Sequence, residues 1–331
     1  MLYLDKPEQL KRGRNLLAFS AGVDSSALFF LLLAHNIRFD IALINYGIRE
    51  QSIEEERYAI DLGKQYNLNV YTKKAPVFQN NFEKNARDFR YDFFDELMRE
   101  KRYDNLITAH QLNDQLEWFL MRLTKGAGAS ELMGLKALSK RKTYTVVRPI
   151  LHHSKEELLN YLNNNAYRYF IDDSNHDEKY ERNYFRNNFS DKLIKKYKNG
   201  IRKSFEYLQE DKEILMGGYQ EIFHHKKLYI LEVNNPMVTV RMVDKYLKKL
   251  GYLLSSGQRA EIKKENSIVI SGLWAIETTS NRVYIAPYKK VVLPKAFKEK
   301  YRIAKIPPKI RGYLYLEHIS IQHINRVQEP S

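Results

Sequence analysis

Residues 16–26 read Leu16-Leu17-Ala18-Phe19-Ser20-Ala21-Gly22-Val23-Asp24-Ser25-Ser26, and an apolar helical pattern follows them. A strand that runs through a loop of small residues into a helix directs several backbone N–H groups and the positive helix end at one point. This arrangement suits a phosphate group, and the hydroxyls of Ser20, Ser25 and Ser26 can add hydrogen bonds. A carboxylate at Asp24 would repel a bare phosphate, so its presence predicts a bridging divalent cation such as magnesium. An ordinary strand-to-helix turn capped by Ser or Asp is the alternative interpretation.

Around this loop, residues 1–125 alternate short apolar runs with helical patterns. We expect strands at 15–19, 39–45, 69–72 and 105–109, and helices at 25–35, 53–66, 82–101 and 113–123. This order predicts consecutive βαβ units and an α/β fold, a doubly wound and mostly parallel sheet of Rossmann type with its ligand crevice beyond the carboxyl ends of the strands.

The remainder of the chain divides differently. Residues 124–152 are rich in small and basic residues, so we expect an irregular connection, mobile without substrate, before a helix at 154–164. Charged helical patterns cover 183–223, further helices are expected near 238–250 and 258–264, and strands at 267–270, 273–278 and 282–285. The sequence therefore predicts an α/β domain over residues 1–200, a helical linker over 201–226 and a small basic α+β domain over 227–331.

The positive charge is concentrated in the C-terminal part. The net charge is +15, yet residues 1–190 contain 28 Lys and Arg against 26 Asp and Glu, whereas residues 191–331 contain 27 against 14. Because basic side chains that neutralise phosphates release counterions, this excess indicates a polyanionic partner such as nucleic acid. A solvated basic surface or attraction to an anionic membrane would produce the same charge.

Several classes of function are excluded or disfavoured by composition. The chain has no cysteine, which rules out disulfides, thiolate metal sites, iron–sulfur clusters and cysteine nucleophiles. No run of about 18 apolar residues is present, so no membrane span is expected. The N-terminal residues lack the pattern of a signal peptide, and we expect a cytoplasmic location.

A second candidate site lies where the fourth expected strand enters a helix. His110, Asp114 and Glu117 are spaced so that all three side chains can face the same crevice. Two carboxylates beside a histidine can hold magnesium or steer a nucleophilic amine. The alternative is a helix start whose acidic residues suit the helix dipole.

Both segments resemble known families. Residues 20–26 resemble the Ser-Gly-Gly-x-Asp-Ser loop of the ATP pyrophosphatases, with Ala21 at the first glycine; its methyl group is tolerated if φ is below zero, or else narrows the nucleotide cradle. Residues 110–117 resemble the His-His-x-x-Asp-x-x-Glu motif of the tRNA(Ile)-lysidine synthetases, with Gln111 at the second histidine. Further similarities to that family lie at 45–49, 86–91, 122–128, 148–150, 172–175, 182–186 and, more weakly, 256–259 and 284–286.

The resemblance implies a two-step ligation. ATP adenylates the first-anticodon-position cytidine of isoleucine tRNA with a CAU anticodon, and free lysine then displaces AMP to give lysidine. It implies that residues 20–26 (Ser20, Ala21, Gly22, Val23, Asp24, Ser25 and Ser26) hold ATP, and that Asp24 and Asp114 hold magnesium. By the same resemblance, the developing negative charge is neutralised by Arg87, Arg90 and Arg182. It further implies that Glu117 helps Asp114 to position the metal and the amine, and that His110 transfers a proton or contacts phosphate.

Two other classes of function stay open from sequence. One is another ATP pyrophosphatase, such as a tRNA thiolase, which the lack of cysteine disfavours, or an amidotransferase supplied by a separate glutaminase chain. The other is a non-catalytic, nucleotide-sensing RNA binder, which the departures at Ala21 and Gln111 make conceivable. A homodimer is neither required nor excluded.

Overall fold

The computed structural model describes residues 2–47, 51–78, 80–171 and 181–325. Contacts within the chain divide it into two compact units, Met1–Gln209 and Glu210–Ser331. Each unit contains its own sheet and its own buried core, and each is described separately below.

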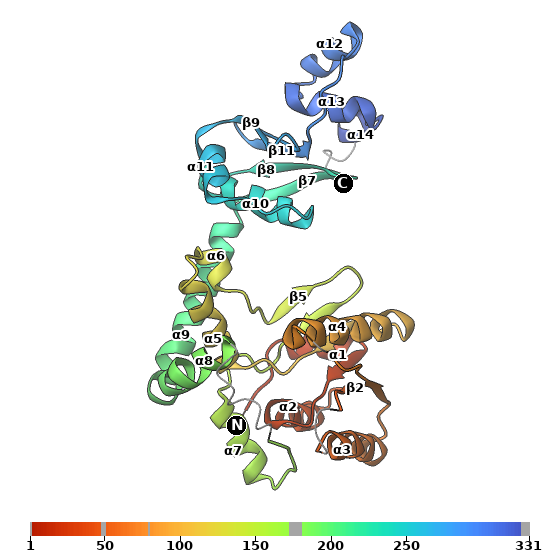
Figure 1. The fold of residues 1–331 in the computed structure, drawn as a ribbon, viewed down its shortest axis with the longest axis vertical. Coiled ribbons are helices and arrows are strands. Elements are labelled where there is room, and N and C mark those ends of the chain that lie inside the picture. The colour runs from red at the N-terminus through yellow and green to blue at the C-terminus, as the bar shows by residue number, and fades with distance from the viewer. Residues whose placement is uncertain (1, 48–50, 79, 172–180, 326–331) are drawn as a thin grey trace. The chain divides into compact units, whose positions relative to one another are not determined.

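The first unit is built on a six-stranded sheet in the order β3-β2-β1-β4-β6-β5 (Figure 1). Its strands are β1 (Asn15–Ala18), β2 (Asp40–Asn45), β3 (Val70–Lys74), β4 (Asn105–Ile107), β5 (Leu138–Lys140) and β6 (Thr145–Val147). All neighbouring strands pair in parallel except β5, which is antiparallel to β6. From β1 the strand order proceeds through β2 to β3 on one side, and the chain then returns to place β4 on the other side of β1. The strand order therefore reverses between β1 and β4, and open α/β sheets bind ligands at such a switch point.

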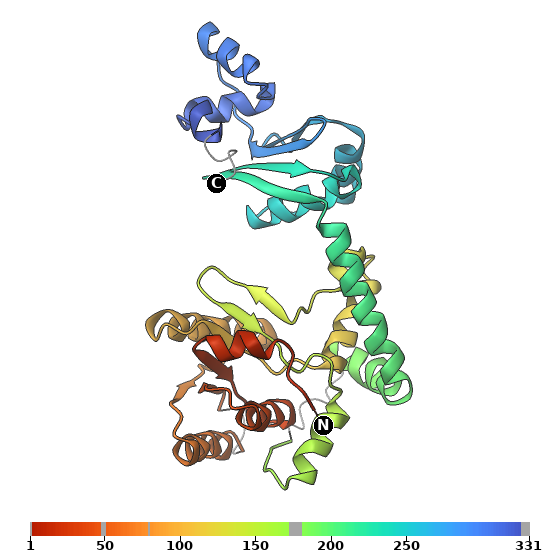
Figure 2. The same cartoon turned by 180° about the vertical axis from the view of Figure 1, so that it is seen from behind.

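Helices cover both faces of this sheet, as the views from the two sides show (Figures 1 and 2). One core contains residues of α1 (Pro7–Arg12), α2 (Val23–Ala34), α3 (Gln51–Tyr66) and α7 (Lys155–Asn164), whereas α4 (Phe82–Glu100) packs with Leu16, Ala42 and Leu106 in a separate core. The predicted doubly wound sheet is thus confirmed. From Ala27 to Leu32, α2 is continuously apolar and buried. Among the described residues, no helix is both long and apolar enough to cross a bilayer.

The expectation of an irregular connection over residues 124–152 is wrong for three short parts of this segment. Residues Ala129–Leu132 form the short helix α6, and β5 and β6 form a hairpin whose second strand pairs with β4. Val146 and Val147 are completely buried in this pairing. Strands of three residues are too short to produce an alternating pattern in the sequence, which is why the hairpin was not predicted.

After α5 (Leu112–Leu123) and α7, the chain continues through α8 (Glu181–Phe185), a π-helical turn η2 (Arg186–Ser190) and the long helix α9 (Asp191–Met216). The predicted helical linker over 201–226 is helical only to Met216, because residues Tyr219–His225 form strand β7 of the second sheet. The boundary between the two compact units lies inside α9, after Gln209.

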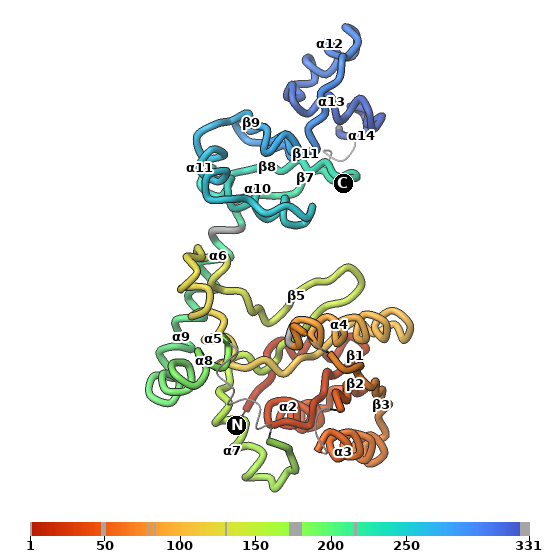
Figure 3. The backbone as a smooth tube through the Cα atoms, in the orientation of Figure 1, coloured from red at the N-terminus to blue at the C-terminus, as the bar shows by residue number. Residues whose placement is uncertain are grey.

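The second unit is a five-stranded antiparallel sheet with helices on both faces (Figure 3). Its strand order is β7-β8-β11-β10-β9, with β7 (Tyr219–His225), β8 (Leu228–Val233), β9 (Ser267–Ile270), β10 (Trp274–Thr278) and β11 (Arg282–Pro287). Helices α10 (Thr239–Lys249) and α11 (Ser256–Lys264) belong to one core; α12 (Lys295–Ile303), α13 (Pro308–Leu316) and α14 (Ile321–Asn325) belong to the other. This arrangement agrees with the predicted α+β character.

Candidate active site

A pocket of about 480 Å³ lies beyond the carboxyl ends of the parallel strands in the first unit. Its wall combines the loop after β1, the segment after β4, one side of α4 and the start of α7. The predicted site residues in its lining are Ser20, Gly22, Val23, Asp24, Ser25, Arg87, Arg90, His110, Asp114 and Arg182. Ala21, Ser26 and Glu117 do not line it. Two segments separated by about ninety residues in sequence therefore meet at one cavity, as the sequence predicts.

The loop after β1 is held in shape by its own hydroxyl groups. The Oγ atoms of Ser20 and Ser25 lie 3.1 Å apart, and the Ser25 hydroxyl donates to the carbonyl oxygen of Gly22 at 3.1 Å. The buried Ser26 hydroxyl donates to the carbonyl oxygen of Ala21, also at 3.1 Å. Ser26 thus stabilises the loop from its buried side, whereas Ser20 and Ser25 line the pocket.

Ala21 has a left-handed backbone conformation, with φ of 58°. The condition under which its methyl group would be tolerated without strain, a φ below zero, is therefore not met. The side chain is completely buried, and the Ala21 carbonyl oxygen accepts a hydrogen bond from the Phe170 backbone at 2.9 Å. Holding a residue with a Cβ atom in this conformation costs about 1–2 kcal/mol, which the surrounding contacts must offset.

Asp24 lies at the first turn of α2 and faces the pocket. Burial and the nearby charge of Asp114 raise the pKa of its carboxyl group to about 7, although Lys155 and Arg186 oppose the shift. Among the described residues, its Oδ1 atom is buried and has no hydrogen-bond partner. A buried oxygen of this kind suits a divalent cation, because Mg²⁺ prefers carboxylate oxygens. Asp24 therefore has the chemistry required of a metal ligand.

Gln111 and His110 have distinct local roles at the start of α5. The Gln111 side chain accepts from the Asn113 backbone at 2.5 Å, and the Gln111 backbone donates to Asp114 Oδ2 at 3.0 Å, which together form a capping box. His110 Nδ1 lies 3.0 Å from Thr108 Oγ1. Burial lowers the pKa of His110 to about 4 despite the opposing charge of Asp114, so the imidazole is neutral near pH 7.

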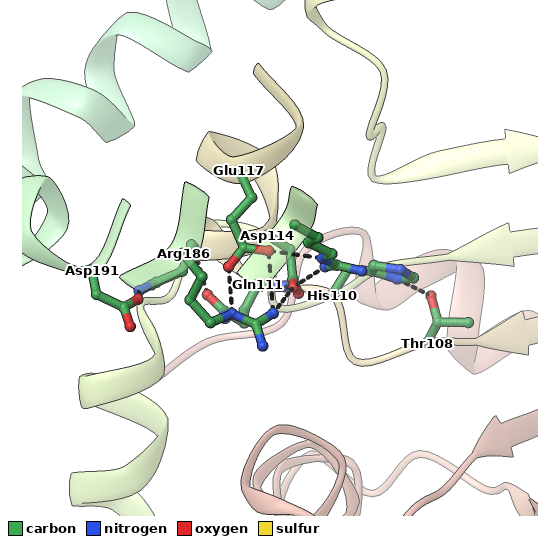
Figure 4. Close-up of polar contacts among 9 residues, drawn as sticks. Thr108, His110, Gln111, Asp114, Glu117, Arg186 and Asp191 are labelled. Atoms are coloured by element: carbon green, nitrogen blue, oxygen red, sulfur yellow. Dashed lines mark hydrogen bonds and ion pairs between the residues drawn. The ribbon is translucent and has the colours of Figure 1, made fainter. Parts of the chain in front are cut away.

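Asp114 and Glu117 are engaged by two arginines that follow in α8 and η2 (Figure 4). Glu117 accepts hydrogen bonds from Arg182 Nε at 2.8 Å and from Arg186 Nε and Nη2 at 2.7 and 3.2 Å. Asp114 accepts from Arg182, and its Oδ1 lies 3.6 Å from Arg186 Nη2. These four residues form an ion cluster in which the two positive and two negative charges balance. Its carboxylates are buried, whereas the Arg182 side chain is 38% exposed.

The ion cluster alters the pKa values of its two carboxyl groups in opposite directions. Burial would raise the pKa of Asp114, but Arg182, His110 and Arg186 together lower it. Burial and the charge of Asp114 raise the pKa of Glu117 in spite of both arginines. The Glu117 side chain is only 1% exposed, so in this arrangement it supports the arginines and does not reach the cavity.

The remaining predicted arginines differ in their environment. Arg87 and Arg90 on α4 line the pocket, with the Arg87 guanidinium 5.5 Å from the centre of the Tyr91 ring. Arg122 instead stacks on Trp118 at 4.7 Å. Other matching residues also lie outside the pocket lining: Lys125 pairs with Glu181, and buried Arg148 donates to Lys136 and Ser139. The similarity at 172–175 falls outside the described residues.

The structure adds pocket residues to which the sequence analysis gave no role. They include Tyr46, Lys155, Phe170, Arg186, Asn187 and Asp191. Lys155 begins α7 after the capping residue Ser154, where a lysine is indistinguishable in sequence from a solvated surface residue. Arg186 had a sequence signal, because it is the last residue of the segment 182–186, which is similar to the lysidine synthetases.

The fold and the pocket together define a PP-loop protein. The family model of the PP-loop domain matches residues 3–193. Among solved structures, the U34-tRNA thiolase NcsA of Methanococcus maripaludis, with its [4Fe-4S] cluster, is similar with a TM-score of 0.52 and 17% identity, covering 63% of this chain and 75% of that chain. This likeness supports the fold alone.

Curated relatives extend the similarity over nearly the whole chain. The tRNA(Ile)-lysidine synthase of Campylobacter jejuni is 44% identical over 96% of this chain and 97% of the relative, and that of Wolinella succinogenes is 42% identical over 96% and 98%. The enzyme of the same name from Helicobacter pylori is 42% identical over 94% and 92%. The chain belongs to the tRNA(Ile)-lysidine synthase family, which confirms the resemblance and the prediction that the protein is an enzyme.

Proposed function

We propose that the protein ligates lysine to the first-anticodon-position cytidine of isoleucine tRNA with a CAU anticodon, using ATP and releasing AMP and pyrophosphate. The observation that carries this proposal is the single pocket that joins the loop after β1 to the start of α5, in a chain 42–44% identical to tRNA(Ile)-lysidine synthases. The PP-loop domain supports the use of ATP.

The phosphates of ATP are assigned to the loop after β1. Its backbone N–H groups and the start of α2 favour negative charge, and Ser20 and Ser25 present hydroxyls at the same place. Asp24 is the first candidate ligand for magnesium, and Asp114 is the second, on the condition that it loosens its contact with Arg182. When bound, the metal would neutralise charge on the phosphates.

The first chemical step is the attack of the cytidine carbonyl oxygen on the α-phosphorus of ATP. The new phosphorus–oxygen bond forms as the bond to the β-phosphate breaks, and pyrophosphate leaves with the electron pair. Arg87 and Arg90 lie in the pocket wall, where their guanidinium groups can stabilise this developing negative charge. In the second step the ε-amine of lysine displaces AMP, and neutral His110 is a candidate hydrogen-bond acceptor for the amine.

The tRNA body is assigned to the basic C-terminal part of the chain. Residues 191–331 contain nearly twice as many basic as acidic residues, and neutralising tRNA phosphates with them releases counterions. We therefore expect tRNA affinity to fall steeply with salt. A cytoplasmic location and a possible homodimer remain predictions.

The decisive experiment combines ATP, magnesium, labelled lysine and tRNA with a CAU anticodon, followed by mass spectrometry of the nucleosides. The expected product is lysidine; its absence from reactions with folded protein contradicts the proposal. Asp24→Asn should abolish pyrophosphate release while leaving tRNA affinity nearly unchanged. Asp211→Asn, at an exposed position in α9, is the matched control and should retain both activities. Equal loss of both in folded Asp24→Asn would contradict the assignment of Asp24 to the nucleotide.

A further inference from the structure

Three helices of the first unit begin at the same pocket. α2 starts at Val23, α5 at Leu112 and α7 at Lys155, and residues at each of these starts line the cavity. α7 also packs against α2. Since the N-terminal end of a helix has a partial positive charge, each of these three ends contributes favourably to binding an anion in the pocket.

Lys155 projects from one of these helix starts and has a firmly held backbone. Its N–H donates to Asn113 Oδ1 at 3.2 Å, and Asn113 Nδ2 donates to Asp191 Oδ1 at 2.7 Å. The preceding Ser154 forms a capping box with Glu157. The position of Lys155 is therefore fixed by contacts to α5 and α9 as well as by its own helix, as expected of a residue that must meet a ligand in one geometry.

Glu157 also stabilises the first turn of α7. Its carboxylate accepts from the Ser154 backbone at 2.8 Å and lies 3.0 Å from Lys198 Nζ and 2.9 Å from Arg202 Nη2. Both cations belong to α9. Consequently the first turn of α7 is tied to α9 by charge-assisted contacts, and movement of Lys155 is limited to its side chain.

The ammonium group of Lys155 differs in its partners from the guanidinium groups of Arg182 and Arg186. Arg182 and Arg186 are committed to the ion cluster with Asp114 and Glu117. Over the described ranges of the chain, by contrast, no carboxylate oxygen lies within 4.0 Å of Lys155 Nζ. Lys155 lines the same pocket as Ser20, Asp24 and Ser25 of the loop after β1. It is therefore available to an anionic ligand that this loop binds.

We propose that Lys155 binds the pyrophosphate portion of ATP from the side opposite the loop after β1 and remains bound to pyrophosphate as it leaves. The inference rests on the proposed function for the identity of the nucleotide. When the bond between the α-phosphorus and its bridging oxygen breaks, the electron pair moves to the β-phosphate oxygen. An ammonium group at this place stabilises the added negative charge and so favours the adenylation step.

The test compares two fragments of the nucleotide. Binding of inorganic pyrophosphate and of AMP to the full chain is measured by titration calorimetry in magnesium buffer. Lys155→Met should weaken pyrophosphate binding about tenfold or more, because a charge-assisted hydrogen bond to phosphate is lost. AMP binding should change less than twofold, and Lys155→Arg should recover part of the pyrophosphate affinity. Lys195→Met, at an exposed position of α9, controls for the loss of one positive charge and should leave both affinities unchanged.

Each other outcome overturns the inference. Equal weakening of AMP and pyrophosphate would assign Lys155 to the adenosine or α-phosphate side, or to general support of the pocket. Unchanged affinity for both fragments, or a loss of tRNA affinity alone, would assign it elsewhere. Circular dichroism spectra verify that the variants are folded. Because binding of fragments does not require lysidine formation, a failure of the proposed function would be recognised separately from a failure of this inference.

Discussion

Glu117→Gln is expected to lower the unfolding free energy of the first unit by about 3–5 kcal/mol, because it removes the fully buried charge of the ion cluster. Glu117 has no exposed surface and accepts three hydrogen bonds from two guanidinium groups. A glutamine side chain has only one oxygen that can accept these hydrogen bonds, and its NH₂ group would face the N–H donors of the arginines. Arg182 keeps its contact with Asp114, whereas the two hydrogen bonds that Arg186 donates to the two Glu117 oxygens cannot both be kept.

The two tryptophans of the chain provide a specific assay. Trp118 follows Glu117 directly on α5, and Trp274 lies in the second unit. In a Trp274→Phe background, fluorescence during urea titration therefore reports on the first unit alone. With a urea dependence of about 2–3 kcal/mol per molar, the expected loss shifts the unfolding midpoint by roughly 1–2.5 M.

Two comparisons make this prediction refutable. Glu100→Gln, at the exposed end of α4, should change stability by less than about 0.5 kcal/mol. Replacing both Glu117 and Arg186 by leucine should cost clearly less than the sum of the single replacements, because the double variant leaves fewer buried charges unpaired. If Glu117→Gln unfolds at the same urea concentration as the wild type, the ion cluster does not stabilise the unit as argued.

Three further predictions concern stability. Hydrogen bonds from Ser154, Lys198 and Arg202 outweigh burial and lower the pKa of Glu157 to about 2. Glu157→Gln should therefore lower the unfolding free energy by about 2 kcal/mol at pH 7. Thermal unfolding should show this difference shrinking as the pH falls from about 5 towards 2. Burial raises the pKa of Asp5 to about 6, so the folded state loses stability as pH rises from about 4 through 6; Asp5→Asn should raise the melting temperature at pH 7.5 and not at pH 4, and an equal gain at both would refute burial of charge as the cause. A Cβ atom at Gly134 would lie 2.0 Å from Trp118 Nε1, so Gly134→Ala should perturb Trp118 fluorescence and destabilise the first unit. Gly200 lies in open space on α9, so Gly200→Ala should stabilise the first unit by about 1 kcal/mol. Similar effects at both positions would contradict the packing argument.

The elements that the sequence predicts well are those with long or strongly patterned apolar segments. The strand and helix that flank the loop after β1 are recognisable because residues 15–18 and 27–32 are continuously apolar or buried. β7 is different: its residues Tyr219–His225 are half exposed, and their charged pattern continues that of α9. Only pairing with β8, a tertiary contact, decides that this segment is a strand.

The candidate site shows the same division. Asp24 and Asp114 are predictable because each follows a buried strand at the same edge of the sheet. The pairing of Glu117 with Arg182 joins residues 65 positions apart, which no local pattern encodes. Lys155 carries no signal of its own, since only the packing of α7 against α2 brings it to the pocket.

The left-handed backbone at Ala21 limits which side chains evolution or a saturation library can place there. Glycine relieves the backbone strain and needs no space, so it should be enriched among active variants. Valine, isoleucine and threonine should be depleted, because a branched Cβ is disfavoured at this φ and the position is sealed by the surrounding core. Within the nucleotide loop, position 21 is therefore expected to tolerate few side chains other than those of glycine and alanine.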